Sequence, residues 1–206
     1  MTATKNQPRG ARQFTDDIYQ LRHLRRTAPH PSWAAARRLS AAQIKYIRRR
    51  CLGADLSIDE YIGLQPSIQI VRAAHLPVPA LLLSGSGRDQ WAIHVRSTSL
   101  DGEQRYQLAR EFKYCLDAPL VHRLYGPDDK LSHQRAALAA DQFADELLMP
   151  ARQLRHVADH GAPTALDVAA RFDVTPEHAQ RRLTELGLVH PSRPTPLPRG
   201  GLRHGR

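Results

Sequence analysis

The spacing of apolar residues predicts a chain that is helical towards both ends and carries a short sheet in between. Apolar positions recur every three or four residues, as on one face of an amphipathic helix, in six segments. The predicted helices are 16–27, 40–53, 103–117, 132–149, 164–171 and 175–187. The period shifts towards two between residues 66 and 99, which predicts strands over 67–73, 80–83 and 90–96.

Local signals place the starts of several helices and set the fold class. Ser40 with Gln43 has capping-box spacing, Ser132 is expected to open the long helix that follows, and Thr164 and Thr175 are expected to cap the last two. The three strands are joined by segments too short for crossover helices, so an antiparallel sheet is expected. The sequence therefore predicts an α+β fold: helices packed around a small three-stranded antiparallel sheet, followed by a helix-turn-helix-like pair.

Length and composition narrow the class of protein. A chain of 206 residues with 41% hydrophobic and 24% charged residues suits one globular domain with appendages. No apolar run approaches the roughly 20 residues of a membrane helix, and residues 1–10 lack the apolar core of a secretory signal. Cys51 and Cys115 are too few for a disulfide framework or a four-cysteine zinc site. We expect a soluble cytoplasmic protein without a membrane partner.

The formal charge of +10 is concentrated at the two ends of the chain. Residues 1–50 hold 12 Lys or Arg against 2 acids, residues 51–186 hold 14 against 18, and the last segment to residue 206 holds 4 Arg and no acid. Arg48, Arg49 and Arg50 are therefore candidates for phosphate contacts. The charge makes DNA binding through the ends a candidate function and says little about the middle.

Two segments of the middle carry motifs of a known family. Residues 105–117 contain Arg-Glu-Phe-Lys-Tyr followed by Cys-Leu-Asp, and residues 139–150 end in Phe-Ala-Asp-Glu-Leu-Leu-Met-Pro. These segments resemble the ImmA/IrrE family of zinc metallopeptidases, in which a His-Glu-x-x-His helix is followed by a helix that ends in Leu-Leu-Met-Pro. The strand over 91–95 and the closing segment 182–188 are also similar to that family. The resemblance covers residues 55–188.

The resemblance implies a zinc site whose ligands are replaced in this chain. The two His positions are occupied by Arg110 and Tyr114, and the position of the third ligand, a Glu, by Ala137. Glu111 keeps the position of the general base, which in the family polarises a zinc-bound water. Arg cannot donate a lone pair to a metal, and Ala has no donor atom. We therefore expect no metal and a vestigial Glu111.

The same comparison suggests what the altered site does. We expect Arg110 to pair with a nearby carboxylate, Glu111, Asp117 or Asp141, and so to replace the charge of the metal. Arg110, Tyr114, Asp117 and Asp141 are the candidates for a partner-binding cleft between the motif helix and the 132–149 helix. The family implies control of a DNA-binding repressor, so the leading hypothesis is an inactive regulator that sequesters a helix-turn-helix repressor of a phage or mobile element.

Two alternatives to the hypothesis of an inactive regulator remain open. An active metallopeptidase with unorthodox ligands would need zinc, and His156 with His160 has the i, i+4 spacing of a displaced metal pair. A DNA-binding regulator would use the basic ends, with Arg181 and Arg182 of the helix-turn-helix-like pair as further candidates. Cys115 is expected to be a buried thiol and not a nucleophile.

The expected organisation has four parts. A basic helical region covers 1–53, a metallopeptidase-like domain 54–152, a small helical segment 153–189 and a disordered basic tail 190–206. Residues 1–13 are also expected to form a loose tail.

Overall fold

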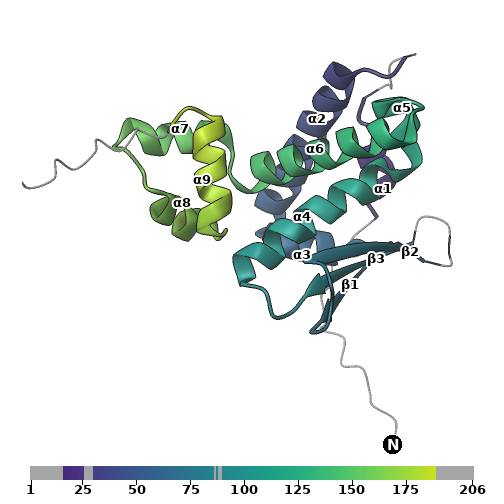
Figure 1. The fold of residues 1–206 in the computed structure, drawn as a ribbon, viewed down its shortest axis with the longest axis horizontal. Helices are drawn as coiled ribbons and strands as arrows, with labels where there is room; N and C mark the ends of the chain where they lie inside the picture. Colours follow the sequence, from purple (N-terminus) through teal and green to yellow (C-terminus); the bar gives the residue numbers. More distant parts are fainter. Residues whose placement is uncertain (1–15, 26–29, 86, 88–89, 189–206) are drawn as a thin grey trace, which may run out of the picture.

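Helix α4 (Asp101–Asp117) runs through the middle of the molecule, between a small sheet and the long helix α6 (Asp129–Leu148), as Figure 1 shows for the computed structural model. The structure describes residues 16–25, 30–85, 87 and 90–188. Helix α2 (Trp33–Ala54) packs on α6, and the short helix α1 (Ile18–Arg22) packs on α4. The parts predicted as tails, 1–13 and 190–206, lie outside the described residues.

The sheet is mixed, which corrects the antiparallel arrangement expected from the sequence. Its strands are β1 (Ile68–Ala73), β2 (Ala80–Ser84) and β3 (Trp91–Arg96), in the order β1-β3-β2. β3 pairs antiparallel with β2 but parallel with β1. The expectation was wrong for the neighbour of β1. β2 lies beyond β3 and runs opposite to β1, and the chain turns back once more after β2. The returning strand then inserts beside β1 in the same direction, and no crossover helix is needed.

The two C-terminal helices begin where the sequence predicts. Thr164 and Asp167 form a reciprocal capping box before α8 (Ala165–Phe172), and the Thr175 side chain accepts a hydrogen bond from the backbone N–H of His178 at the start of α9 (Pro176–Glu185). The structure confirms both caps. They could be predicted because the two partners of each cap lie within one turn of each other. The structure thus contains the predicted pair of helices joined by a short turn.

Two other predicted helix starts are wrong. α2 begins at Trp33 behind the cap Ser32, so Ser40 lies inside the helix. The segment 33–39 is rich in alanine and other strong helix formers, which extends the helix towards the N-terminus. The side chain of Asp128 caps α6, while the Ser132 hydroxyl donates to the carbonyl of Asp129.

The sequence patterns also missed several short elements. These are α3 (Ile58–Gly63), the 3-10 turn η1 (Ala118–Leu120), α5 (Val121–Tyr125) and α7 (Ala151–Asp159). α3, η1 and α5 span six residues or fewer and are too short to show several turns of apolar periodicity. None of the described helices is long and apolar enough to cross a membrane.

The core lies on both faces of α4 and extends under the C-terminal helices. The main cluster joins Tyr61 of α3, Ile93 of β3, Phe112 of α4 and Phe143 of α6. A second cluster fills the space between α2, α5 and α6. Because α4 is buried along most of its length, the polar side chains on its remaining stripe are held in fixed surroundings.

Candidate functional site

Two rows of side chains face each other where α4 packs on α6. On α4 the row is Tyr106, Arg110 and Tyr114, and on α6 it includes Asp141 and Asp145, each member one turn from the next. Ala137 precedes Asp141 by one further turn. Tyr106 donates its hydroxyl to the backbone carbonyl of Asp141, at 3.3 Å. These rows contain the positions that the family resemblance assigns to the metal ligands.

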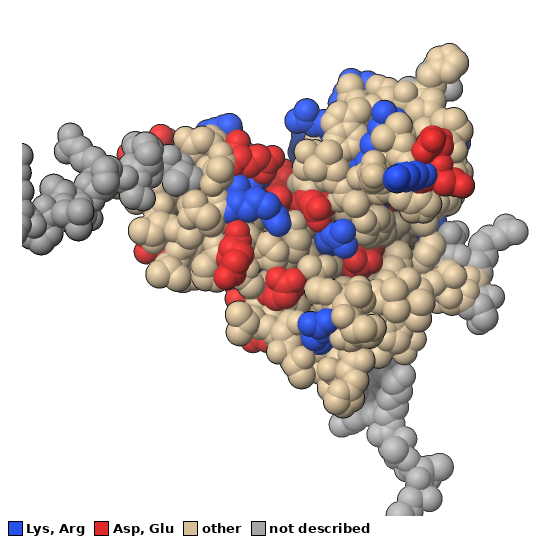
Figure 2. All heavy atoms as spheres, in the orientation of Figure 1, with Lys and Arg blue, Asp and Glu red and all other residues tan. Residues whose placement is uncertain are grey.

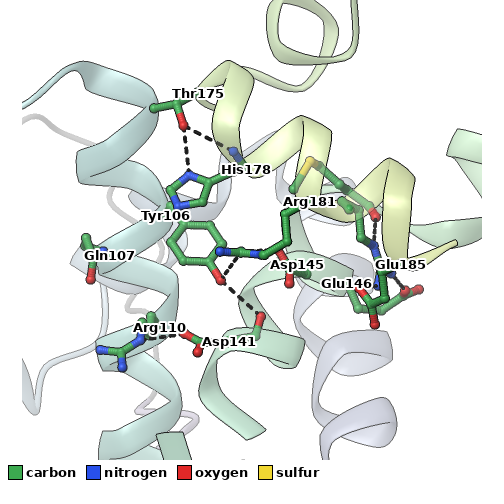
Figure 3. A network of polar contacts seen from close by, with 12 residues as sticks. Tyr106, Gln107, Arg110, Asp141, Asp145, Glu146, Thr175, His178, Arg181 and Glu185 are labelled. Carbon is green, nitrogen blue, oxygen red and sulfur yellow. Dashed lines mark hydrogen bonds and ion pairs between the residues drawn. The ribbon is translucent and has the colours of Figure 1, made fainter. Parts of the chain in front are cut away.

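Arg110 pairs with two carboxylates, as expected from the sequence. Its Nε lies 2.7 Å from Oδ1 of Asp141, and its Nη1 lies 3.1 Å from Oε1 of Glu111. The first of these ion pairs bridges α4 and α6 (Figure 3). The Arg110 side chain is 26% exposed and that of Asp141 is 41% exposed. The guanidinium thus joins the two helices at a partly accessible edge of their interface.

Glu111 lies behind this ion pair, with its side chain only 7% exposed. Burial raises the pKa of the Glu111 carboxyl above its usual value, and the neighbouring Arg110 opposes the shift. The hydrogen bond from Arg110 occupies one of its oxygens. Glu111 therefore has the burial of a functional carboxylate but has a guanidinium as its partner.

The residues present do not fit a zinc ion at the position that the resemblance indicates. Arg110 is a cation, and Ala137 offers no donor atom. Tyr114 has its hydroxyl 3.4 Å from Nη2 of Arg110, and burial raises the pKa of this phenol. Among the described residues, no group of three or more His, Cys, Asp or Glu side chains could hold a metal ion.

Asp117 does not belong to this edge, which corrects its place among the cleft candidates. It is buried, with one oxygen 2.8 Å from Nζ of Lys113 and the other accepting a hydrogen bond from the Tyr125 hydroxyl. Lys113 also donates to Oε1 of Gln43, at 2.8 Å. Asp117 is three residues beyond Tyr114 and faces α2 and α5, so its role is to neutralise a buried lysine.

A polar network joins α9 to the same two rows (Figure 3). Arg181 donates from Nη2 to the Tyr106 hydroxyl at 2.6 Å and to Oδ1 of Asp145 at 2.8 Å. The His178 ring stacks on Tyr106, with the centroids 3.7 Å apart. Burial lowers the pKa of His178, although Glu103 near its Nε2 opposes the shift. These contacts hold α9 against the N-terminal half of α4.

The two nucleic-acid candidates on α9, Arg181 and Arg182, both form ion pairs within the molecule but differ in exposure. Arg182 is 4% exposed and forms ion pairs with Glu146 and Glu185. Arg181 is bound to Asp145. Arg182 is therefore not presented to solvent as a residue of a recognition helix would be, whereas the side chain of Arg181 is 48% exposed and its role as a phosphate contact stays a prediction. Figure 2 shows acidic and basic side chains interleaved along this junction.

The arginines at the end of α2 differ in their surroundings. Arg49 is exposed, Arg48 is half-buried, and Arg50 lies 3.1 Å from a carboxylate oxygen of Asp17. Their role as phosphate contacts stays a prediction, and Arg49 is the most accessible of the three.

Among the described residues, the other side chains singled out from the sequence, His156, His160 and Cys115, do not form a second site. His156 of α7 and His160, which caps the C-terminus of that helix, are exposed, and Nδ1 of His160 lies 2.7 Å from the His156 carbonyl oxygen. Cys115 is buried, as expected, and burial raises the pKa of its thiol. A buried thiol with a raised pKa is a poor nucleophile.

The sequence patterns missed Tyr106, Asp145 and His178. A signal for the first two was present, since they continue the four-residue spacing of Arg110 and Asp141 by one turn. His178 had no such signal, because its contact with Tyr106 depends on how α9 folds back onto α4.

Comparison with known proteins gives the family. A family model described as "IrrE N-terminal-like domain", Peptidase_M78, matches residues 71–184. A solved Mycobacterium tuberculosis transcriptional regulator is similar with a TM-score of 0.52 and 17% identity, over 81% of this chain and 51% of that one. The chain thus spans about half of that protein, and the likeness shows the fold alone. No curated protein matches. The family match covers the strands β2 and β3, α4 and α6 and more than half of the chain, and the chain therefore belongs to the family of IrrE N-terminal-like domains.

Proposed function

We propose that this protein is a catalytically inactive member of its family that acts by binding a protein partner, a helix-turn-helix repressor of a phage or mobile element. Its mechanism would be sequestration of the repressor and not cleavage. The observation that carries the proposal is the position of Arg110, paired with Asp141 and Glu111 where the resemblance expects a metal ligand.

The chemistry of the replaced positions supports the absence of peptidase activity. A catalytic zinc site needs three protein ligands and an open position for water. Arg110 and Ala137 supply none of these ligands, and a phenol with a raised pKa is a poor one. Glu111 accepts a hydrogen bond from the guanidinium of Arg110, so one of its carboxylate oxygens is already engaged with a cation of the protein itself.

The exposed edge of this cluster is the proposed partner contact. The side chains of Arg110 and Asp141 are both partly accessible and of opposite charge. Such a pair offers a donor and an acceptor to a polar segment of a partner, which favours specificity more than affinity. Tyr114 is half-buried beside them and adds an aromatic surface.

Metal analysis tests the loss of the zinc site. The purified chain is expected to hold far less than stoichiometric zinc. The variant R110H/Y114H/A137E restores three ligands on facing rows and is expected to gain about one zinc per chain. R110Q/Y114F/A137Q is the matched control and should gain none. Stoichiometric zinc in the unmodified chain that falls with Glu111→Gln or His156→Ala would overturn the proposal.

Co-expression with a helix-turn-helix repressor from a neighbouring reading frame tests the mode of action. The expected result is a stable complex in size-exclusion chromatography in which the repressor keeps its full mass. Cleavage of the repressor that stops on addition of a chelator would establish an active metallopeptidase instead.

The exposed cations of α2 favour one second candidate, binding of nucleic acid. Arg37, Arg38, Lys45 and Arg49 are all exposed along this helix. Binding through phosphate contacts would weaken steeply with salt and would be reduced by Lys45→Glu with Arg49→Glu. Fluorescence anisotropy with a labelled duplex at two salt concentrations measures both effects, and salt-independent or absent binding would exclude this function.

A further inference from the structure

A groove of about 490 Å³ lies on a side of the molecule that the altered zinc site does not use. It follows the seam between α2 and α6 and ends against α9. Its bottom is closed by Ile44 of α2 and Phe143 of α6, which are buried, and its accessible apolar side chains are Ala41 and, at the far end, the partly exposed Trp33. The volume is within the range of about 300–1,000 Å³ found for binding sites.

The two long helices that line the groove run in the same general direction. The beginning of α2, with Ala36 and Leu39, shares a cluster with Ala136 and Ala139 of α6. Further along, Arg48 of α2 is close enough to Glu146 of α6 for their charges to interact. From Trp33 to Ile44 the helix rises by about 16 Å, which corresponds to about three turns.

The two ends of the groove carry opposite charges. Arg37 lies near the Trp33 end, is exposed and forms no ion pair with a described residue. Glu146 and Glu185 lie at the α9 end, and their side chains remain 41% and 44% exposed although Arg182 contacts both. Figure 2 shows a hollow between the C-terminal helices and the rest of the molecule, with acidic side chains on the C-terminal side.

We propose that this groove binds an amphipathic helix of about three turns from a protein partner, basic at its N-terminal end and acidic at its C-terminal end. An apolar face of such a helix would cover Trp33 and Ala41, the accessible apolar side chains of the groove, as in other helix-in-groove complexes. Its acidic end would pair with Arg37, and its basic end would lie beside Glu146 and Glu185.

The helix dipole gives the proposal a direction. The C-terminus of a helix carries a partial negative charge and is stabilised by a cation, and the N-terminus is stabilised by an anion. The bound helix therefore places its C-terminus towards Arg37 and its N-terminus towards Glu185. Side-chain charges and dipole then favour the same orientation. The inference deepens the proposed function by giving the chemistry of the partner, and it rests on that function only for the identity of the partner.

Three synthetic peptides of about fifteen residues, a length at which helices begin to persist, test the groove. They share one apolar stripe and differ at their ends: basic then acidic, basic at both, and acidic at both. The chain has two tryptophans, so Trp91→Phe leaves Trp33 as the fluorescent reporter. The first peptide is expected to change its emission and to bind about tenfold more tightly than the other two. Calorimetry with the unmodified chain repeats the comparison without the Trp91 substitution.

Arg37→Glu is the decisive variant. It makes both ends of the groove acidic, so the preference should move to the peptide that is basic at both ends. Arg49→Glu makes the same charge change outside the groove and should leave the original order. The proposal is overturned if no peptide binds, or if Arg37→Glu leaves the order unchanged. Metal analysis is independent of these titrations, so failure of the groove and failure of the proposed inactivity are distinguishable.

Discussion

The guanidinium of Arg110 on α4 lies 2.7 Å from the carboxylate of Asp141 on α6, and the same guanidinium covers the buried carboxylate of Glu111. One cation therefore compensates two acids at the interface of the two helices that carry the family motifs. Its removal leaves Glu111 buried with no partner, and a buried charge without a partner is costly.

Arg110→Met is expected to lower the free energy of unfolding by about 1–3 kcal/mol at neutral pH. Burial already raises the pKa of Glu111, and loss of the cation raises it further. The folded state then holds its proton more tightly than the unfolded state, so stability falls as pH rises above the usual range of a glutamate. Urea unfolding at pH 4 and pH 7 should show the larger loss at pH 7. In the R110M/E111Q control this pH dependence should disappear, and its persistence would assign it to another group.

Lys113→Met is expected to lower the free energy of unfolding by more, about 3–5 kcal/mol, because it leaves the buried carboxylate of Asp117 without its cation. The double variant K113M/D117L should recover part of this loss, since it removes both charges from the interior. Lys130→Met, at an exposed position, is the matched control and should change stability little. Chemical denaturation of the unmodified chain, K113M, D117L and K113M/D117L gives the coupling energy between Lys113 and Asp117. Additive effects would mean that the two side chains do not depend on each other.

His178 is expected to make the attachment of α9 sensitive to acid. Burial lowers its pKa, so the unfolded state takes up a proton first as pH falls through the ordinary range of histidine. The stability contributed by the neutral ring against Tyr106 is therefore present at pH 7.5 and is lost below about pH 6. Hydrogen exchange of the α9 amides should be faster at pH 5.5 after correction for intrinsic rates. His178→Gln should remove this dependence, whereas His156→Gln, on an exposed histidine, should not.

Gly102→Ala is expected to loosen the C-terminal helices from α4. A Cβ atom at this position would lie 2.7 Å from the carbonyl carbon of Val174, in the turn between α8 and α9. Backbone atoms cannot move aside as a side chain can, so the cost should be about 1–3 kcal/mol. Gly53→Ala is the matched control, because nothing lies within 4 Å of its Cβ and alanine favours the helix. Thermal unfolding should show a lower Tm for the first variant and an equal or higher Tm for the second.

Local patterns predicted those features whose partners lie within one element. The three strands lie within one residue of their predicted ends, and the caps of α8 and α9 form from residues three apart. Predictions that depend on contacts between different elements were less successful. The parallel pairing of β1 with β3 depends on packing that no short segment contains.

Residue identities by themselves determined that Arg110, Tyr114 and Ala137 supply no metal-binding set, because the donor atoms of a side chain are fixed by its chemistry. The tertiary structure decided the partners of the charged residues: Arg110 lies between Glu111 and Asp141, Asp117 neutralises a buried lysine, and Arg182 is buried against α6. All are charged residues on helices, and the sequence gives each the same ability to pair. Which partner each one finds depends on the orientation of the helices, and that orientation is set by the core.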